Sequence, residues 1–366
     1  MRAMASDAPS RTDTAAEPAN HKEVQMITTP LESTARTLVA PGRGILAADE
    51  SHPTIEKRFS SLGIENTVEN RRVYRQMLFT TPEVAEFISG VILFDETIRQ
   101  KADDGTPLGN LLIRRGMIPG IKVDKGTKPL AGARGELITE GLDGLRERLA
   151  EYRGLGARFA KWRAVFTIGQ GIPSPYCLDA NAHALARYAA LSQEAGLVPI
   201  VEPEVLMDGD HTIERCAEIT EAALHAVFAE LHRQRVALEA MLLKPNMILP
   251  GKSCPRPASV QEVAETTIRT LRRAVPAAVP GIVFLSGGQN DADATAHLNA
   301  MNAMAETHPW PLSFSYGRAL QSAAQQAWKG DPGRIAAGQR AFHHRARLNG
   351  LARSGQYRPE MEQLVA

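Results

Sequence analysis

The chain has few cysteines and no excess of charge of either sign. Its 366 residues include only three cysteines, and none of them belongs to a C-x-x-C pair. A sparse and odd cysteine count argues against a disulfide framework and favours a reducing compartment. Lysine and arginine number 42 against 41 acidic residues, which gives a formal net charge of +1. This balance argues against a protein that binds nucleic acid or acidic membranes by bulk electrostatic attraction.

Long apolar runs and closely spaced metal ligands are also missing. No run of about 18 apolar residues occurs, so we expect no segment that spans a membrane. The ten histidines form no H-E-x-x-H motif or other close ligand spacing. A zinc enzyme is therefore disfavoured, although distant ligands can converge in a fold.

The N-terminal stretch differs in composition from the rest of the chain. Residues 1–25 are polar and alanine-rich, without the apolar segment that a secretory signal peptide requires. Arg2 and Arg11 leave a transit peptide open, but four acidic residues in the same stretch count against it. We predict a disordered extension over 1–25, one folded domain over 26–345, a C-terminal tail over 346–366 and a cytoplasmic location.

Eight short apolar runs alternate with longer amphipathic segments. Glycine or proline lies close to these runs, which is typical of buried strands. Leucine spacing predicts a helix over 142–155, and Asn66 followed by Glu69 resembles the capping box of another helix. The eight runs cover residues 44–49, 90–95, 120–124, 159–168, 197–204, 241–248, 281–288 and 312–317.

Strands that alternate with helices predict a parallel sheet of the α/β class. Eight is also the number of strands that closes a (β/α)8 TIM barrel. The alternative is an open, doubly wound sheet, which often carries a G-x-G-x-x-G turn after its first strand, and this chain has no such turn. We therefore predict a single TIM barrel with an N-terminal extension and a C-terminal tail.

Charged or polar residues stand at or near the end of nearly every run, where a buried strand should be apolar. In a barrel these side chains would gather at the mouth where such folds place their chemistry. A single lysine or aspartate there is usually solvated or caps the next helix, but repetition along the strands favours one shared site. The residues are Asp49, Asp95, Lys122, Lys161, Glu202, Glu204, Lys244, Ser286 and Arg318.

Three lysines gathered with several carboxylates indicate chemistry at an amine. Neighbouring ammonium groups and a poorly hydrated pocket favour a neutral lysine, and lowering its pKa from about 10.4 to about 7 requires roughly 4–5 kcal/mol. A neutral lysine can attack a carbonyl and form a Schiff base. Lys244, between Leu243 and Pro245, is the best-desolvated candidate, and Lys161 is the best candidate for the neighbour that keeps it neutral.

Two basic clusters suggest a substrate that carries phosphate at both ends. The SGG sequence at 286–288 and Arg318 follow the seventh and eighth runs, where TIM barrels frequently bind phosphate. Lys57 and Arg58, together with Lys122, could hold a second phosphate. Without that context the pair Lys57-Arg58 would be interpreted as an exposed helix face.

The motifs, taken together, strongly resemble the class I, metal-independent fructose-1,6-bisphosphate aldolases. The similarity runs from about residue 30 to about residue 350. It consists of multi-residue blocks in the same order: GILAADES (44–51), ENRRVYRQML (69–78), GVILFDET (90–97), KADDGTPL (101–108), GIKVDKG (120–126), FAKWR (159–163), IVEPEVL (200–206), LLKPNMI (242–248), FLSGGQ (284–289) and SFSYGRALQ (313–321).

The resemblance implies the reversible cleavage of fructose 1,6-bisphosphate through a lysine imine, without a metal ion or cofactor. It implies that Lys244 forms the imine beside Lys161, that Glu202 assists loss of water with support from Glu204, and that Asp49 takes the C4 hydroxyl proton. It also implies one phosphate site at Ser286, Gly287, Gly317 and Arg318, and contacts to the second phosphate and the hydroxyls from Lys57, Arg58, Lys122, Arg163 and Ser51. Members are commonly homotetramers.

The chain departs from the family pattern at two places. His52 and Pro53 stand where many relatives have Thr-Gly, and proline stiffens that loop. The sequence ends MEQLVA, without the terminal tyrosine that many animal members use for proton exchange, and we assign Tyr357 no catalytic role. Two alternatives stay open: a Schiff-base aldolase or transaldolase for another phosphorylated sugar, and a non-catalytic scaffolding barrel.

Overall fold

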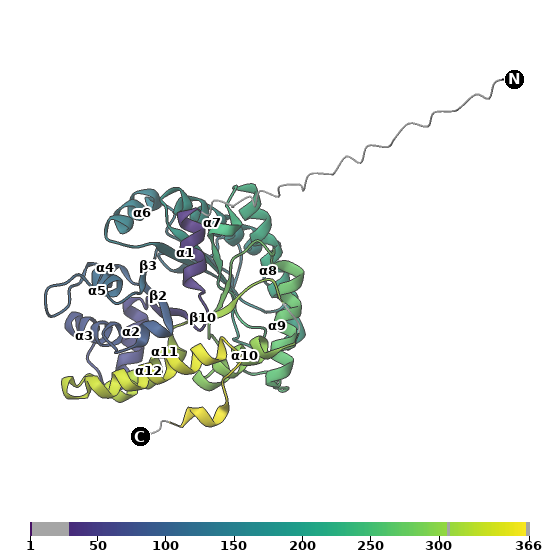
Figure 1. Cartoon of the computed structure of the whole chain (residues 1–366). Coiled ribbons are helices and arrows are strands. Elements are labelled where there is room, and N and C mark those ends of the chain that lie inside the picture. The colour runs from purple at the N-terminus through teal and green to yellow at the C-terminus, as the bar shows by residue number, and fades with distance from the viewer. Residues whose placement is uncertain (2–28, 306–307, 364–366) are drawn as a thin grey trace.

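A closed barrel of eight parallel strands forms the centre of the protein, and helices surround it (Figure 1). The structure, a computed structural model, describes residue 1 and residues 29–305 and 308–363. Around the barrel the strands follow the order β1-β10-β9-β8-β7-β6-β3-β2. Each of the eight predicted runs overlaps one barrel strand, so the prediction of a TIM barrel is confirmed. The predicted extension over 1–25 lies, apart from residue 1, outside the described residues.

The barrel strands are short and their connections are long enough to hold helices. The strands are β1 Gly44–Ala48, β2 Ile88–Leu93, β3 Ile118–Lys122, β6 Phe159–Phe166, β7 Val198–Val205, β8 Leu242–Leu243, β9 Ile282–Phe284 and β10 Leu312–Tyr316. A separate antiparallel pair, β4 Thr127–Pro129 and β5 Leu137–Thr139, lies between β3 and β6 in the chain.

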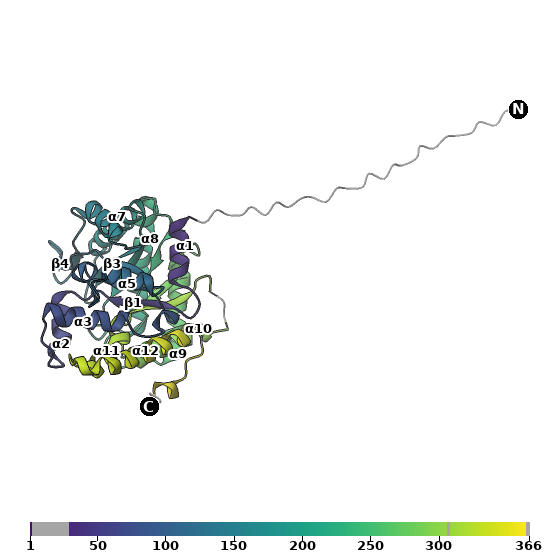
Figure 2. The same cartoon turned by 60° about the vertical axis from the view of Figure 1, so that its left-hand side comes forward.

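The helices of the described residues are α1 Pro30–Leu38, α2 His52–Ser60, α3 Val68–Phe79, α4 Asp95–Arg99, α5 Leu108–Arg114, α6 Leu145–Gly154, α7 Pro175–Glu194, α8 Ile213–Arg233, α9 Val260–Ala274, α10 Asp291–Ala303, α11 Arg318–Trp328 and α12 Ile335–Ala352. Short 3-10 helices are η1 Val84–Glu86, η2 Leu238–Ala240, η3 Pro332–Arg334 and η4 Pro359–Glu362. The last two long helices, α11 and α12, pack side by side in both views (Figures 1 and 2).

Serine and threonine caps begin several of these helices. Ser174 and Ser259, for example, accept a backbone N–H at the starts of α7 and α9, which satisfies a donor that the helix leaves free. The predicted cap at Asn66 is wrong by one residue, because the Thr67 side chain accepts from Asn70 N at the start of α3. The predicted start of the tail at residue 346 falls inside α12, which continues to Ala352.

Apolar side chains and α1 fill the end of the barrel at which the strands begin. Because strand side chains alternate between the two faces, every second residue points inward. Ala35 and Leu38 of α1, with the adjacent Val39, close this end of the barrel. The inward-facing strand residues packed against them are Ile45, Ala47, Ile92, Phe159, Val198, Ile200, Leu242 and Val283. A β-carbon on Gly120 would lie 2.2 Å from the Phe159 ring, so glycine on β3 makes room for this large inward side chain. The barrel is thus a packed core, with its chemistry confined to one end.

Candidate active site

Toward the carboxyl ends of the strands, the inward-facing positions change from apolar to polar side chains. Asp49 continues the row of Ile45 and Ala47 on β1, and Lys244 follows Leu242 on β8. On β6, Lys161 and Arg163 continue the row that begins with Phe159. On β7, Glu202 and Glu204 continue the row of Val198 and Ile200. The period of two therefore brings these side chains together at the carboxyl end of the barrel.

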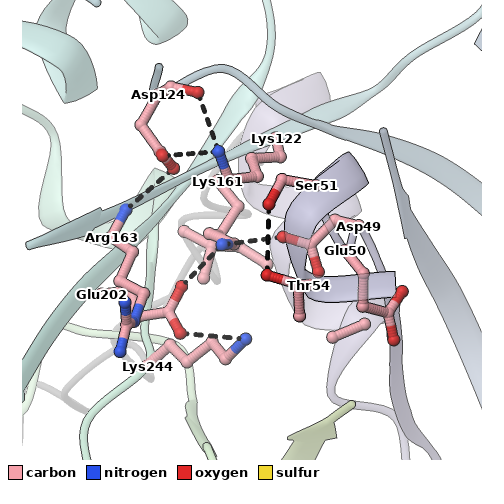
Figure 3. Close-up of polar contacts among 12 residues, drawn as sticks. Asp49, Glu50, Ser51, Thr54, Lys122, Asp124, Lys161, Arg163, Glu202 and Lys244 are labelled. Carbon is pink, nitrogen blue, oxygen red and sulfur yellow. Dashed lines mark hydrogen bonds and ion pairs between the residues drawn. The ribbon is translucent and has the colours of Figure 1, made fainter. Parts of the chain in front are cut away.

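Four of the predicted residues form one connected cluster (Figure 3). Lys161 Nζ lies 2.8 Å from Asp49 Oδ2 and 3.1 Å from Glu202 Oε2. Lys244 Nζ lies 3.2 Å from the other carboxylate oxygen, Glu202 Oε1. Glu202 therefore stands between two amines, within reach for proton transfer to either.

The cluster is almost sealed from water. The side chains of Lys161, Glu202 and Lys244 are each 4% exposed, and that of Asp49 is 12% exposed. Charges so placed interact more strongly than they would in solvent. Two lysines and two carboxylates can balance their charges here, which is how buried ionisable groups are tolerated.

The ion pairs determine the protonation of Asp49 and Lys161. Burial alone would raise the pKa of Asp49, but Lys161 and Lys244 outweigh burial and hold that pKa far below its usual range. Burial alone would lower the pKa of Lys161, but Asp49 and Glu202 outweigh it and raise that pKa. Asp49 is therefore a carboxylate and Lys161 an ammonium at neutral pH.

The surroundings of Lys244 match the sequence analysis in part. Lys244 is buried, as expected from its apolar neighbours. Its backbone N–H donates to Val201 O at 2.8 Å, which fixes the residue at the end of β8. However, the group that contacts its amine is the Glu202 carboxylate, whereas the sequence argument relied on positive neighbours to keep the amine neutral.

A second group of charged residues lies beside the first. Lys122 Nζ is 2.6 Å from Asp124 Oδ1, and Arg163 N donates to Asp124 Oδ2 at 3.3 Å. Arg163 Nε pairs with Glu204 Oε2. Burial opposes the charge of Arg163, but Glu204 outweighs it and raises the pKa of the guanidinium. Glu204 thus contacts Arg163, whereas Glu202 contacts the two lysines.

The residues predicted for one phosphate lie after β9 and at the start of α11. Ser286 is buried, and Gly287 approaches Glu204 so closely that a β-carbon there would be 2.9 Å from Glu204 Oε1. Gly317 immediately precedes α11, and Arg318 Nη2 donates to Gln289 O at 2.9 Å. The structure therefore brings the glycine loop and Arg318 together, at a helix N-terminus that favours anions.

The residues predicted near the second phosphate come from three places: Ser51 caps the start of α2, Lys57 and Arg58 lie in its last turn, and Lys122 and Arg163 lie on β3 and β6. Ser51 Oγ lies 3.1 Å from Thr54 Oγ1, and Lys57 is exposed on α2. Arg58 pairs with Glu50, and its Nη2 would be 3.8 Å from a β-carbon on Gly317. Arg58 consequently borders a residue that we assigned to the first phosphate.

Sequence reasoning missed several residues that support the site. Glu50 contacts Arg58 and Arg75, and Asp124 contacts Lys122 and Arg163. Both acids stand in sequence blocks that carry the resemblance: Glu50 directly follows Asp49, and Asp124 lies two positions after Lys122. Their position just after a predicted strand could have identified them as residues near the mouth of the barrel. Tyr357 donates through its hydroxyl to Glu362 at 2.9 Å, which is not a residue of the cluster.

Two further features concern the described part of the chain. Within it, no group of three or more His, Cys, Asp or Glu side chains is arranged to hold a metal ion. Residues 29–305 and 308–363 also include no helix with both the length and the apolar character to cross a membrane.

The fold and the cluster define the class: an α/β-barrel protein with buried lysines and carboxylates at the carboxyl mouth of the barrel, suited to covalent chemistry at an amine. Comparison with known proteins gives the same answer. The family model described as "Fructose-bisphosphate aldolase class-I" matches residues 30–366. The chain belongs to the class-I fructose-bisphosphate aldolase family and is therefore a carbon–carbon lyase, as its motifs indicated.

Individual relatives cover nearly all of the chain. It is 60% identical over 329 residues to a "Probable fructose-bisphosphate aldolase class 1" of Xanthomonas campestris, which covers 90% of this chain and 98% of that protein. It is 53% identical to the non-muscle aldolase of Lethenteron camtschaticum, covering 90% and 91% of the two chains. A Plasmodium falciparum fructose-bisphosphate aldolase, solved with TRAP and a small-molecule inhibitor, has a TM-score of 0.88 and 49% identity, covering 90% of this chain and 95% of that one.

Proposed function

We propose that the chain cleaves fructose 1,6-bisphosphate reversibly to dihydroxyacetone phosphate and glyceraldehyde 3-phosphate through an imine on Lys244. The observation that carries this proposal is the buried contact between Lys244 and Glu202, 3.2 Å apart. A lysine that is to attack a ketone must lose a proton, and Glu202 is within reach to accept it.

Imine formation requires two proton transfers at one place. The Lys244 amine adds to the C2 carbonyl carbon, and the carbinolamine then loses its hydroxyl group as water when that oxygen is protonated. Glu202 serves as the base in the first step and as the acid in the second. Lys161, which contacts the same carboxylate at 3.1 Å, keeps a positive charge beside the departing oxygen.

Carbon–carbon cleavage then uses the imine as an electron sink. Asp49 takes the proton of the C4 hydroxyl, the C4 carbonyl forms, and the electron pair of the C3–C4 bond moves into the protonated imine to give an enamine. The ion pair with Lys161 keeps Asp49 ionised before the substrate binds, and the carboxylate is the form that can accept a proton. Glyceraldehyde 3-phosphate leaves first; protonation of the enamine and hydrolysis of the imine release dihydroxyacetone phosphate.

Two groups of residues at the mouth of the barrel would hold the two phosphates. Ser286, Gly287, Gly317 and Arg318 would hold the phosphate of the dihydroxyacetone half, and Lys57, Arg58, Lys122, Arg163 and Ser51 would hold the second phosphate and the hydroxyl groups. Two basic groups at the mouth favour a bisphosphate over the monophosphate substrates of other Schiff-base aldolases or transaldolases.

Arg318→Ala is expected to raise KM for fructose 1,6-bisphosphate by about tenfold to a hundredfold, with a smaller fall in kcat. The reason is the loss of a charge-assisted contact to phosphate, worth about 1.5–3 kcal/mol. Steady-state kinetics measure both values. Arg215→Ala is the control, because Arg215 is an exposed arginine paired with Glu218 on α8. An unchanged KM in Arg318→Ala would rule out its phosphate role.

The assay for the function is cleavage of fructose 1,6-bisphosphate after treatment with EDTA. We expect both triose phosphates to form at the untreated rate, because the lysine and carboxylates supply the chemistry. Loss of activity that added divalent metal restores would contradict the proposal. Absence of any cleavage, with or without metal, would favour the scaffolding barrel, and equal turnover of monophosphate sugars would favour the other aldolases.

The domain limits, the oligomeric state and the location belong to the same proposal. We assign residues 1–25 to an extension and begin the catalytic domain at residue 26. Because α12 continues to Ala352, the domain ends there and not at residue 345, and the tail follows it. The family resemblance supports a homotetramer, which sedimentation would test. All three cysteines are free, which supports a reducing compartment such as the cytoplasm.

A further inference from the structure

A buried ion-pair network lies directly behind Asp49. The next residue, Glu50, turns away from the lysine cluster (Figure 3), and its carboxylate contacts two guanidinium groups. Arg75 Nη2, from α3, lies 2.6 Å from Glu50 Oε2, and both side chains are 4% exposed. Arg58 Nη1, from α2, contacts Glu50 Oε1. One carboxylate thus joins a fully buried arginine to an arginine at the mouth of the barrel.

Gln321 connects this network to the start of α11. Its Nε2 donates to Glu50 Oε1 at 2.8 Å and to Ala47 O at 2.7 Å, and its Oε1 accepts from Arg75 Nη1 at 3.3 Å. Its backbone N–H donates to Gly317 O at 3.2 Å. The network therefore fixes Glu50 relative to β1, α3 and the turn that begins α11.

The charges in this network do not cancel. Burial opposes the ionised form of Glu50, but Arg75 and Arg58 outweigh burial and hold the pKa of Glu50 below its usual range. One negative charge therefore faces two positive charges, which leaves a surplus of one. Since Arg75 is buried and Arg58 is 24% exposed, the surplus is presented at Arg58, beside Gly317.

We propose that Arg75 is a positioning residue for phosphate binding. It neutralises Glu50, so that Arg58, which we assigned to the second phosphate and which borders Gly317, keeps a net positive charge for bound phosphate. Without Arg75, Glu50 would pair with Arg58 alone and the surplus charge would disappear. The inference rests on the proposed function, because it adds a residue to the same site. Arg75 acts through Glu50 and Arg58 and does not itself touch the substrate.

The test compares variants that differ in the charge around Arg58. Arg75→Met is expected to raise KM for fructose 1,6-bisphosphate, and the inhibition constant of inorganic phosphate, by about tenfold, with a smaller change in kcat. The double variant Arg75→Met/Glu50→Gln restores the surplus charge and is expected to recover most of both losses. Arg75→Lys keeps the charge and is expected to stay within about threefold of the wild type.

The control is Arg71→Met, one helical turn earlier on α3. Arg71 also forms an ion pair, with Glu96, but Glu96 has no contact with Arg58. This variant is expected to lower the melting temperature and leave KM unchanged. If Arg75→Met does not fold, the double variant and Arg75→Lys carry the comparison.

Two results would overturn the inference: folded Arg75→Met with KM within about twofold of the wild type, or a double variant that recovers neither KM nor phosphate inhibition. If the role of Arg75 were purely structural, the double variant would recover neither value, because Glu50→Gln does not replace a missing packing contact. Failure of the proposed function gives a different outcome, since the wild type itself would then cleave no fructose 1,6-bisphosphate.

Discussion

Lys244→Ala is expected to lower kcat for cleavage of fructose 1,6-bisphosphate by about 10⁴-fold or more, as removal of a covalent nucleophile does in other enzymes. The variant should still fold, because Glu202 retains Lys161 as a partner at 3.1 Å. It should also still bind inorganic phosphate, since the residues at Ser286 and Arg318 are intact. A coupled assay measures kcat, a thermal melt measures folding, and the rise in melting temperature with added phosphate measures phosphate binding.

The matched control for this prediction is Lys252→Ala. Lys252 is a lysine eight positions later, whose amine pairs with Asp208 at 2.8 Å on the surface. Both side chains of that pair are more than half exposed, and such pairs contribute little. We expect activity close to that of the wild type. A Lys244→Ala enzyme that keeps more than about a tenth of wild-type kcat would mean that another group carries the reaction.

Glu202→Gln has the second largest expected effect. Glutamine keeps the shape of the side chain but neither accepts nor delivers a proton, so kcat should fall by about 10²–10⁴-fold, the usual worth of general acid–base catalysis. Imine formation should be the slowed step, so single-turnover trapping of the adduct should slow by the same factor. The inhibition constant of phosphate should not change, because Glu202 contacts the lysines and not the phosphate residues.

Glu204→Gln provides the comparison within the same strand. Glu204 also points into the barrel from β7, but it pairs with Arg163 and contacts neither lysine in the structure. Its loss should therefore cost kcat less than the loss of Glu202. Equal losses in the two variants would contradict the assignment of proton transfer to Glu202 and would instead indicate a shared electrostatic role.

The barrel and most of its polar rows could be predicted from the sequence. Buried strands require continuous apolar residues, so a lysine within FAKWR or LLKPN is conspicuous and its inward direction follows from the alternation along a strand. Lys244 and Glu202 could therefore be identified before their distance was known. The helix cap at Thr67 was missed because Asn66 has the same capping chemistry one position earlier.

Partners far apart in sequence could not be predicted in this way. An arginine within an amphipathic helix is ordinarily solvated, so nothing local marks Arg75 as buried against Glu50, which lies 25 positions away. The same limit applies to the contact between Glu202 and Lys244. The sequence indicates which residues are near the mouth, whereas barrel closure decides which oxygen faces which amine.

Trapping with borohydride tests the central claim most directly. The wild-type protein, incubated with fructose 1,6-bisphosphate or dihydroxyacetone phosphate and reduced, should lose activity and carry one three-carbon phosphate adduct on the peptide that contains Lys244. Omission of the sugar should leave it active and unlabelled. Full activity after reduction, or an adduct that maps to Lys161 and not to Lys244, would contradict the account.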